Sequence, residues 1–231
     1  MANKSSRDLG PAAATIQAER EYTVSCRHGR TFSFSPQRTA FLAIDMQRDF
    51  LLNDDRTPGK MFRIVPRFRD LTALMRRLGC RIIHTRESYA ADGSDMTPHK
   101  ASMDYVGRDG PLGRYLVRGE YGYDFIDELQ PEPDETVLDK PSFGAFCTTD
   151  LDDILRSAGI THLVLAGVTT QCCVHSTLRE AVDRGYWCLT VADCCAAAKQ
   201  ESHEAALALI AAEDHIFGWI CDLGDIERAC A

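Results

Sequence analysis

Short apolar runs alternate with helical stretches along most of this chain, and that alternation limits the folds it can adopt. The runs that indicate buried strands, five clear and a sixth weaker, are 40–46, 80–85, 135–139, 161–167, 187–192 and 215–219. The helical stretches between them are at about 64–78, 149–158, 171–184 and 200–212. Near-continuous apolar strands that alternate with helices indicate a parallel sheet covered on both faces. The sequence therefore predicts a three-layer, doubly wound α/β fold with a six-stranded, mostly parallel sheet.

The domain organisation follows from the length and from two stretches that lack this periodicity. A chain of 231 residues suits one α/β domain with a single core and is short for two. Residues 1–36 are polar and irregular, so we expect an N-terminal arm that precedes one domain at 37–231. Residues 86–134 are rich in Gly, Asp and Pro and show no clear strand. Because loops of that length are usually functional or disordered, we expect this segment to cover the ligand site.

The composition narrows the partners and the compartment. A formal net charge of -8 argues against nucleic-acid binding, because proteins that bind a phosphate backbone concentrate Lys and Arg. No run reaches the roughly 18 to 20 apolar residues that span a bilayer, and the N-terminus lacks the apolar core of a secretory signal. We therefore expect a cytoplasmic protein with no membrane partner, whose ten cysteines remain free thiols. The adjacent pairs Cys172-Cys173 and Cys194-Cys195 do not have the spacing of a zinc site.

Three polar residues fall at or just beyond the ends of predicted buried strands: Asp45, Lys140 and Cys173. In a parallel sheet the carboxyl ends of the strands share one edge, where ligands collect. A buried carboxylate or ammonium is costly unless it is paired, so Asp45 requires a partner. Taken singly, an Asp in this position more often makes a structural ion pair, and a Cys is more often simply packed. The residues alone leave both interpretations open.

Cys173 differs from the other nine cysteines in its place at the start of a predicted helix. The segment 167–177 runs from a strand through a glycine turn into that helix, so the sulfur lies near free backbone N–H groups. These groups and a nearby ammonium such as Lys140 stabilise a thiolate, which predicts a depressed pKa for the Cys173 thiol. The same N–H groups can hold a developing oxyanion.

The segments 41–50, 139–146 and 167–177 resemble the three sequence blocks of the isochorismatase-like cysteine hydrolases, in the same order and at similar spacing. The resemblance covers about residues 37–225 and implies a Rossmann-like fold. Nicotinamidases of the same superfamily carry a metal-binding Asp-x-His with a further His. Residues 84–92 lack that pattern, so we expect no metal and no cofactor.

The resemblance also implies roles for individual residues. It implies a catalytic triad of Asp45, Lys140 and Cys173. The family typically has a non-proline cis peptide before the nucleophile, which falls here between Val168 and Thr169. The N–H groups of Thr169 and Cys173 would then form the oxyanion hole.

Further stretches, among them 83–87 and 138–151, resemble biuret and triuret hydrolases, with N-carbamoylsarcosine amidase as a relative. This resemblance implies a small ureido substrate whose terminal carbamoyl nitrogen is released as ammonia through a covalent thioester. The candidate substrate-binding residues are Phe50, as an apolar wall, and Lys100 and Glu213, as polar partners. Glu213 stands where biuret hydrolases place a Gln. A carboxylate accepts hydrogen bonds without donating them, which favours triuret over biuret.

Two alternative functions stay open. An amidase that acts on N-carbamoyl amino acids or ureidoacrylate would need a pocket cation for the substrate carboxylate, and Lys100 or Arg86 would supply it. A catalytically silent binding protein of the same fold is the alternative from another functional class. The family commonly forms homo-oligomers, so by resemblance we expect a dimer or a tetramer.

Overall fold

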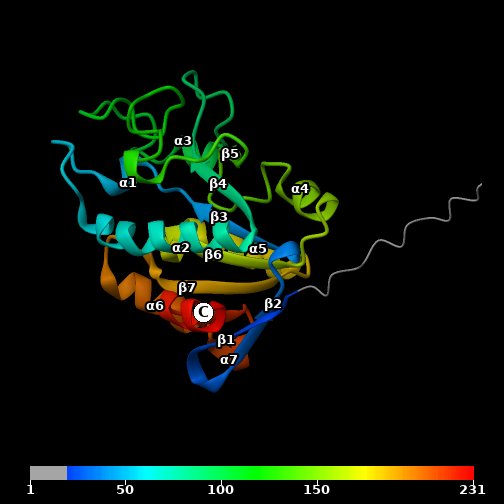
Figure 1. The fold of residues 1–231 in the computed structure, drawn as a ribbon. Helices are drawn as coiled ribbons and strands as arrows, with labels where there is room; N and C mark the ends of the chain where they lie inside the picture. Colours follow the sequence, from blue (N-terminus) through cyan, green and yellow to red (C-terminus); the bar gives the residue numbers. More distant parts are fainter. Residues whose placement is uncertain (1–19) are drawn as a thin grey trace, which may run out of the picture.

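A six-stranded parallel sheet forms the centre of the protein, of which the computed structural model describes residues 20–231 (Figure 1). The strands are β3 (Thr39–Ile44), β4 (Arg81–Glu87), β5 (Thr136–Lys140), β6 (His162–Val168), β7 (Trp187–Ala196) and β8 (Trp219–Cys221). Their order in the sheet is β5-β4-β3-β6-β7-β8, and every neighbouring pair runs parallel. The predicted α/β fold class is confirmed.

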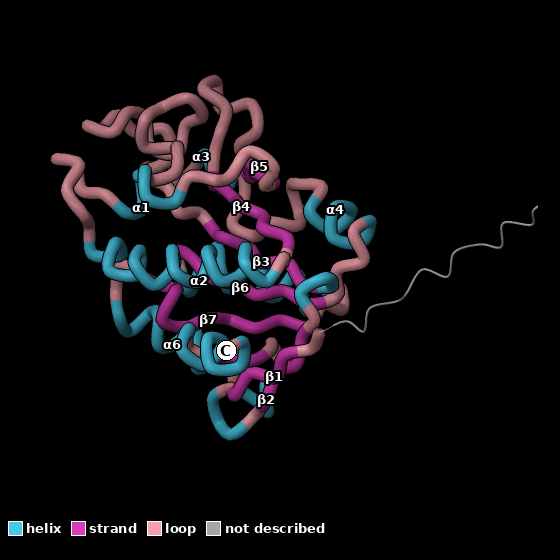
Figure 2. Tube along the Cα trace, viewed as in Figure 1, coloured by secondary structure: helices cyan, strands magenta, loops and turns pink. Residues whose placement is uncertain are grey.

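Helices cover the sheet on both faces, which makes three layers (Figure 2). The longer helices are α2 (Val65–Leu78), α4 (Leu151–Ser157), α5 (His175–Asp183), α6 (Gln200–Ile210) and α8 (Leu223–Cys230). The short helices are α1 (Arg48–Leu51), α3 (Pro98–Ala101) and α7 (Ala212–His215), with 3-10 turns at Arg27–Gly29, Pro36–Arg38, Lys60–Ile64 and Asp127–Leu129 and a π-helical turn at Thr170–Val174. All four predicted helices are therefore present. No helix within residues 20–231 combines the length and the apolar character needed to cross a membrane.

An antiparallel hairpin precedes the sheet, where the sequence analysis expects an irregular arm. β1 (Tyr22–Ser25) pairs with β2 (Thr31–Phe34), and alternate side chains of both strands are buried in the core. The Phe32 ring lies 5.4 Å from a ring of Trp219, and β1 contacts α8. The prediction that this stretch is irregular is wrong for the two strands, because their alternation of apolar and polar side chains is typical of a strand with one buried face. Residues 1–19 of the predicted arm lie outside the described residues.

The last strand lies a few residues later than predicted. β8 begins at Trp219, and the three residues at 213–215 have positive φ angles of 47°, 64° and 69°. Left-handed backbone does not continue a strand. The prediction of a strand at 215–219 is therefore wrong in its position, because apolar composition alone does not distinguish a packed turn from a strand.

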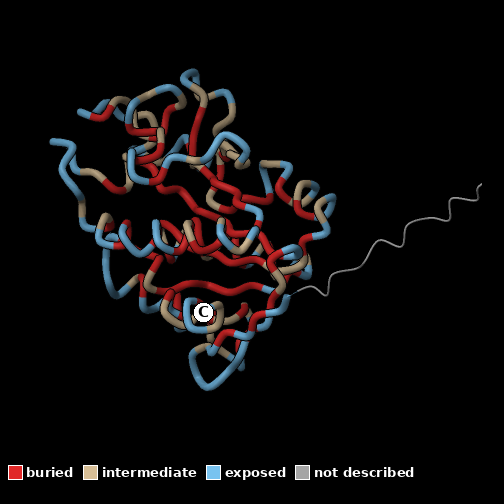
Figure 3. Tube along the Cα trace, in the orientation of Figure 1, coloured by how far each residue is buried: buried red, intermediate tan, exposed pale blue. Residues whose placement is uncertain are grey.

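The long segment 88–134 covers the carboxyl end of the sheet, and it mixes buried and exposed stretches (Figure 3). It contains only α3 and one 3-10 turn as regular structure. Gln47, just after β3, links this segment to the sheet. Its Nε2 donates to the carbonyl of Glu87 in β4 at 3.0 Å and to the carbonyl of Tyr123 in the segment at 2.8 Å. The sheet edge and its cover are thus joined by one buried side chain.

A substitution at Gly167 tests how closely the backbones of β3 and β6 approach each other at the carboxyl end of the sheet. The φ of Gly167 is +132°, and an added Cβ would lie 2.0 Å from the carbonyl oxygen of Ile44. We expect Gly167→Ala to lower the free energy of unfolding by at least about 4 kcal/mol in urea denaturation, because backbone must move. Gly79→Ala is the matched control: Gly79 has a φ of +79° with nothing within 4 Å, so its loss should be about 1 to 2 kcal/mol. Equal losses would contradict the close approach.

Candidate active site

Four polar side chains meet where the sheet strands end. Asp45 follows β3, Glu87 ends β4, Lys140 ends β5, and Cys173 lies in the π-helical turn after β6. Because these strands are parallel neighbours, their carboxyl ends share one edge of the sheet. The structure therefore brings together the three residues predicted as a triad, and it adds Glu87.

Asp45 and Lys140 form a fully buried ion pair. Lys140 Nζ lies 2.8 Å from Asp45 Oδ2, and neither side chain has exposed surface. The Thr85 hydroxyl donates to Asp45 Oδ1 at 2.6 Å, and Lys140 Nζ donates to the Ser142 carbonyl at 2.9 Å. Burial raises the pKa of Asp45, and the Lys140 ammonium offsets this only in part. Burial lowers the pKa of Lys140, but the surrounding negative charges, Asp45 first, outweigh it and raise that pKa.

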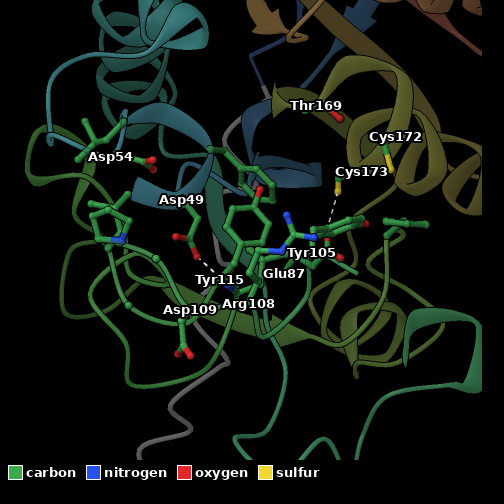
Figure 4. Close-up of a pocket in the computed structure, with 18 of the residues that line it drawn as sticks. Asp49, Asp54, Glu87, Tyr105, Arg108, Asp109, Tyr115, Thr169, Cys172 and Cys173 are labelled. Atoms are coloured by element: carbon green, nitrogen blue, oxygen red, sulfur yellow. Dashed lines mark hydrogen bonds between the residues drawn. The ribbon is translucent and has the colours of Figure 1, made fainter. Parts of the chain in front are cut away.

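Glu87 is the functional candidate that the sequence analysis missed. Cys173 Sγ donates to Glu87 Oε2 at 3.4 Å, shown by a dashed line in Figure 4. Lys100 Nζ lies 2.9 Å from Glu87 Oε1, and the Tyr89 hydroxyl donates to the same oxygen at 2.7 Å. The sequence held a signal for this residue, because a carboxylate that ends an apolar strand resembles Asp45 in its placement.

Lys100 supports the site from behind Glu87. Its side chain is buried, and its Nζ also lies 3.0 Å from the centroid of the Phe143 ring. Lys100 is not among the residues that line the pocket, so the prediction that it contacts substrate is corrected: its ammonium is committed to Glu87. Arg86, the other cation considered, is paired with Asp139 at 2.8 Å and does not line the pocket.

Asp45, Glu87 and Cys173 also present three possible metal-ligand atoms, all within 4.8 Å of one another. Each carboxylate already faces an ammonium, Lys140 for Asp45 and Lys100 for Glu87. Those two positive charges would repel a cation at this position. One ion pair on each side of the Cys173 thiol therefore explains why these three groups lie together.

The surroundings of Cys173 favour the protonated form of its thiol. A hydrogen bond with Cys172, burial and the nearby carboxylates raise the pKa of Cys173 well above its usual value, and Lys140 lowers it without reversing the shift. The predicted depressed pKa is therefore wrong. An ammonium and a helix start alone would lower this pKa, whereas the structure adds burial and a second carboxylate, Glu87, which raise it. The proton of Cys173 must move when the sulfur attacks a substrate.

The turn before the nucleophile has the backbone that the resemblance implies. The peptide between Val168 and Thr169 is cis. Thr169 and Cys173 both line the pocket (Figure 4). The Thr169 carbonyl accepts the N–H groups of Cys172 at 3.1 Å and Val174 at 3.2 Å. An oxyanion hole made of the Thr169 and Cys173 N–H groups stays a prediction.

A pocket of about 570 Å³ opens over Cys173 beneath the covering segment (Figure 4). Aromatic rings form its walls: Phe50 meets Tyr115 edge-on with centroids 6.0 Å apart, and Tyr105 meets Tyr115 edge-on at 5.9 Å. Phe50 thus lies where the sequence analysis expects an apolar wall. Arg108 is the one cation of the lining, and within residues 20–231 no acid lies at ion-pair distance from it.

Glu213 lies away from this pocket. It is exposed, and it follows α6, which carries the chain from the carboxyl edge of the sheet back toward the amino edge, where β8 begins. The prediction of a substrate contact by Glu213 is therefore wrong for this chain. Matching by sequence position placed the residue near the site, but the intervening helix carries it to the other end of the sheet.

Known proteins resemble this chain in sequence and in fold. Residues 39–225 match the isochorismatase domain. The chain is 33% identical over 222 residues to the ureidoacrylate amidohydrolase RutB of Serratia proteamaculans (strain 568), covering 90% of this chain and 88% of that protein. An isochorismatase-like hydrolase from Alkaliphilus metalliredigens has a TM-score of 0.70 at 29% identity, over 84% of this chain and 100% of the other. N-carbamoylsarcosine amidase from Thermoplasma acidophilum has a TM-score of 0.66 at 23% identity, over 82% and 99% of the two chains, which supports the fold alone.

Lys140→Met leaves the Asp45 carboxylate buried without its partner. We expect it to lower the free energy of unfolding by roughly 3 to 5 kcal/mol in urea denaturation, because an uncompensated buried charge is costly. The double variant Asp45→Asn/Lys140→Met should be more stable than Lys140→Met alone. Arg228→Met, which breaks a surface pair with Asp225, is the control and should stay within about 1 kcal/mol of wild type. A double variant no more stable than the single one would contradict the pairing.

Glu87→Gln removes a negative charge beside the thiol, so the pKa of Cys173 should fall. The rate of iodoacetamide labelling at Cys173, followed by peptide mass spectrometry, should reach half-maximum at a pH lower by roughly one unit. In Glu87→Gln the unpaired Lys100 ammonium also lowers the pKa of Cys173. The double variant Glu87→Gln/Lys100→Met removes both charges and so measures the effect of the lost carboxylate without that of an unpaired ammonium. Asp152→Asn, a change outside the pocket, should leave the profile unmoved. An unchanged or higher midpoint in Glu87→Gln would show that Glu87 does not act on the thiol.

Proposed function

The chain belongs to the isochorismatase family, and on that premise we propose that it hydrolyses the terminal carbamoyl C–N bond of a small ureido compound. It is a cysteine-dependent amidohydrolase, as its family and its relatives indicate. The observation that carries the proposal is the Cys173 thiol between two carboxylates, each paired with its own buried ammonium, at the floor of an aromatic-walled pocket.

The first half of the reaction forms a thioester. Asp45, whose pKa is raised, accepts the proton of Cys173 as the sulfur attacks the carbamoyl carbon, and Lys140 keeps the carboxylate in place. The Thr169 and Cys173 N–H groups stabilise the negative charge on the carbonyl oxygen. The C–N bond then breaks, and Asp45 returns the proton so that the nitrogen leaves as ammonia.

The second half of the reaction restores the enzyme. Water attacks the thioester and gives a proton to Asp45, the C–S bond breaks to release the acid, and Asp45 passes that proton to the sulfur to restore the thiol. Glu87 Oε2 accepts the thiol proton of Cys173 at rest; once that proton has moved to Asp45, the same oxygen can accept an N–H group of the carbamoyl nitrogen. That contact would hold the carbamoyl plane in line for attack.

The walls of the pocket support a flat substrate. Phe50, Tyr105 and Tyr115 meet edge-on around a slot that leads to Cys173. Ureido groups are planar and conjugated, so aromatic faces bury them with little strain. Biuret and triuret have this shape, as the resemblance to their hydrolases implies.

A carboxylate-bearing ureido compound is the second candidate, and Arg108 favours it. The Arg108 guanidinium lines the pocket without an acidic partner among the described residues, and guanidinium groups bind carboxylates in a two-pronged geometry. The relative at 33% identity is named for ureidoacrylate, which carries such a group. Triuret is no longer favoured over biuret, because Glu213 is exposed and does not line the pocket.

The oligomeric state and the compartment stay predictions from the sequence. A homo-oligomer would cover the large apolar side chains that the single chain leaves exposed, which include Trp187, Leu209 and Ile216. A cytoplasmic location agrees with ten free cysteines.

Ammonia release from biuret, triuret, ureidoacrylate and N-carbamoyl amino acids, assayed side by side, tests the proposal. We expect turnover of at least one of them by the wild type and none by Cys173→Ala, since the Cys173 sulfur is the thiol that lies within 4.8 Å of both the Asp45 and the Glu87 carboxylates. Cys147→Ala is the matched control, because this thiol is exposed and outside the pocket. Turnover of none of the four by the wild type, as in a silent binding protein, would end the ureido proposal.

Arg108→Gln separates the two substrate classes. If the substrate has a carboxylate, the KM for that compound should rise roughly tenfold, because a charged hydrogen bond is lost, while the KM for biuret or triuret should hold. Arg69→Gln, on the exposed face of α2, is the control and should change neither value. A rise for neutral and charged substrates alike would remove the role in carboxylate binding.

A further inference from the structure

A histidine on α6 holds the nucleophile turn from outside the pocket. Thr170 begins the π-helical turn Thr170–Val174, directly after Thr169. Its Oγ1 lies 2.8 Å from Nδ1 of His203, and the two residues are 0% and 9% exposed. Neither residue lines the pocket, so neither can touch the substrate.

The topology explains why His203 reaches this turn. β7 ends at Ala196 on the carboxyl edge of the sheet, and α6 begins shortly afterwards at Gln200. His203 therefore lies in the first turn of α6, at the end nearest the site. α6 packs against the π-helical turn, which places the imidazole beside the Thr170 side chain.

The imidazole is suited to a neutral hydrogen bond. Burial lowers the pKa of His203, and the positive charges of Arg63 and Arg27 lower it further, against a smaller opposite effect of Glu204. A neutral ring has one nitrogen free to accept the hydroxyl proton of Thr170. The contact therefore gives each of the two buried groups a hydrogen-bond partner in place of water.

We propose that His203 is a positioning residue: through Thr170 it fixes the turn that presents the Thr169 N–H and the Cys173 thiol to the substrate carbonyl. The inference rests on the proposed function, since it assumes that Cys173 attacks a carbonyl. His203 acts through Thr170 and touches no reacting atom. Its loss should therefore change the rate of the chemical step more than the binding of substrate.

Four variants measure this role: Thr170→Val, His203→Leu, His203→Asn and the double variant Thr170→Val/His203→Leu. We expect kcat to fall roughly 10- to 100-fold in Thr170→Val and His203→Leu, with KM within about twofold, because misplaced reacting groups lose rate. His203→Asn should recover most of kcat, since its amide stands near the position of Nδ1. The double variant should be no slower than the single ones, because both remove the same contact.

His162 supplies a matched control at the other end of the sheet. Its Nδ1 lies 2.8 Å from the Thr161 hydroxyl, the same kind of contact at the same distance. His162→Leu can lower the melting temperature, but its kcat should stay at the wild-type value. Unchanged kcat in His203→Leu would overturn the inference. So would an additive loss in the double variant, or a His203→Asn variant as slow as His203→Leu.

A separate measurement distinguishes failure of this inference from failure of the proposed function. If the wild type releases ammonia from none of the ureido compounds, the proposed function fails, but the labelling of Cys173 by iodoacetamide still reports on the turn. We expect the labelling rate, located by peptide fragmentation, to fall several-fold in His203→Leu and Thr170→Val and to hold in His162→Leu. Equal rates in all four proteins would overturn the positioning role.

Discussion

The rest of the site depends on the buried ion pair between Asp45 and Lys140. In the sheet β4 lies between β3 and β5, so the Lys140 side chain reaches across the end of β4 to meet Asp45 at 2.8 Å. Neither charge could remain at this depth without the other, because desolvation of a single ion costs several kcal/mol. Thr85, from the intervening strand, holds the second oxygen of Asp45. The strand order therefore decides whether the site can exist.

A second pair, Lys100 with Glu87, balances the first across the Cys173 sulfur. Two carboxylates and two ammonium groups surround the sulfur, and the hydrogen bond with Cys172 together with burial raises the pKa of the Cys173 thiol. A protonated thiol is a poor nucleophile and also reacts slowly with oxidants and alkylating agents. The nucleophile thus lies beside a carboxylate, Asp45, whose raised pKa suits it to accept the thiol proton. Attack on a substrate and transfer of the proton then occur together.

Chemistry and selection of substrate belong to different parts of the fold. The reacting groups stand on strand ends and on a helical turn, which packing holds in place, as precise catalysis requires. The aromatic walls and Arg108 belong mostly to the covering segment, whose backbone is irregular. Irregular segments tolerate change more readily than strands do. Relatives with the same sheet edge can therefore act on different amides through a different cover.

Sequence alone determined the alternation of strands and helices, and through it the sheet edge where Asp45, Lys140 and Cys173 meet. These features depend on local periodicity and on the position of a residue at a strand end, which neighbouring residues specify. Tertiary structure decided the rest. In the folded chain Lys100 pairs with Glu87, Glu213 lies toward the amino end of the sheet, and the β1-β2 hairpin packs on the core. Each of these outcomes depends on which distant segments pack together, and the free energies of burial and charge pairing that select them belong to the folded chain as a whole.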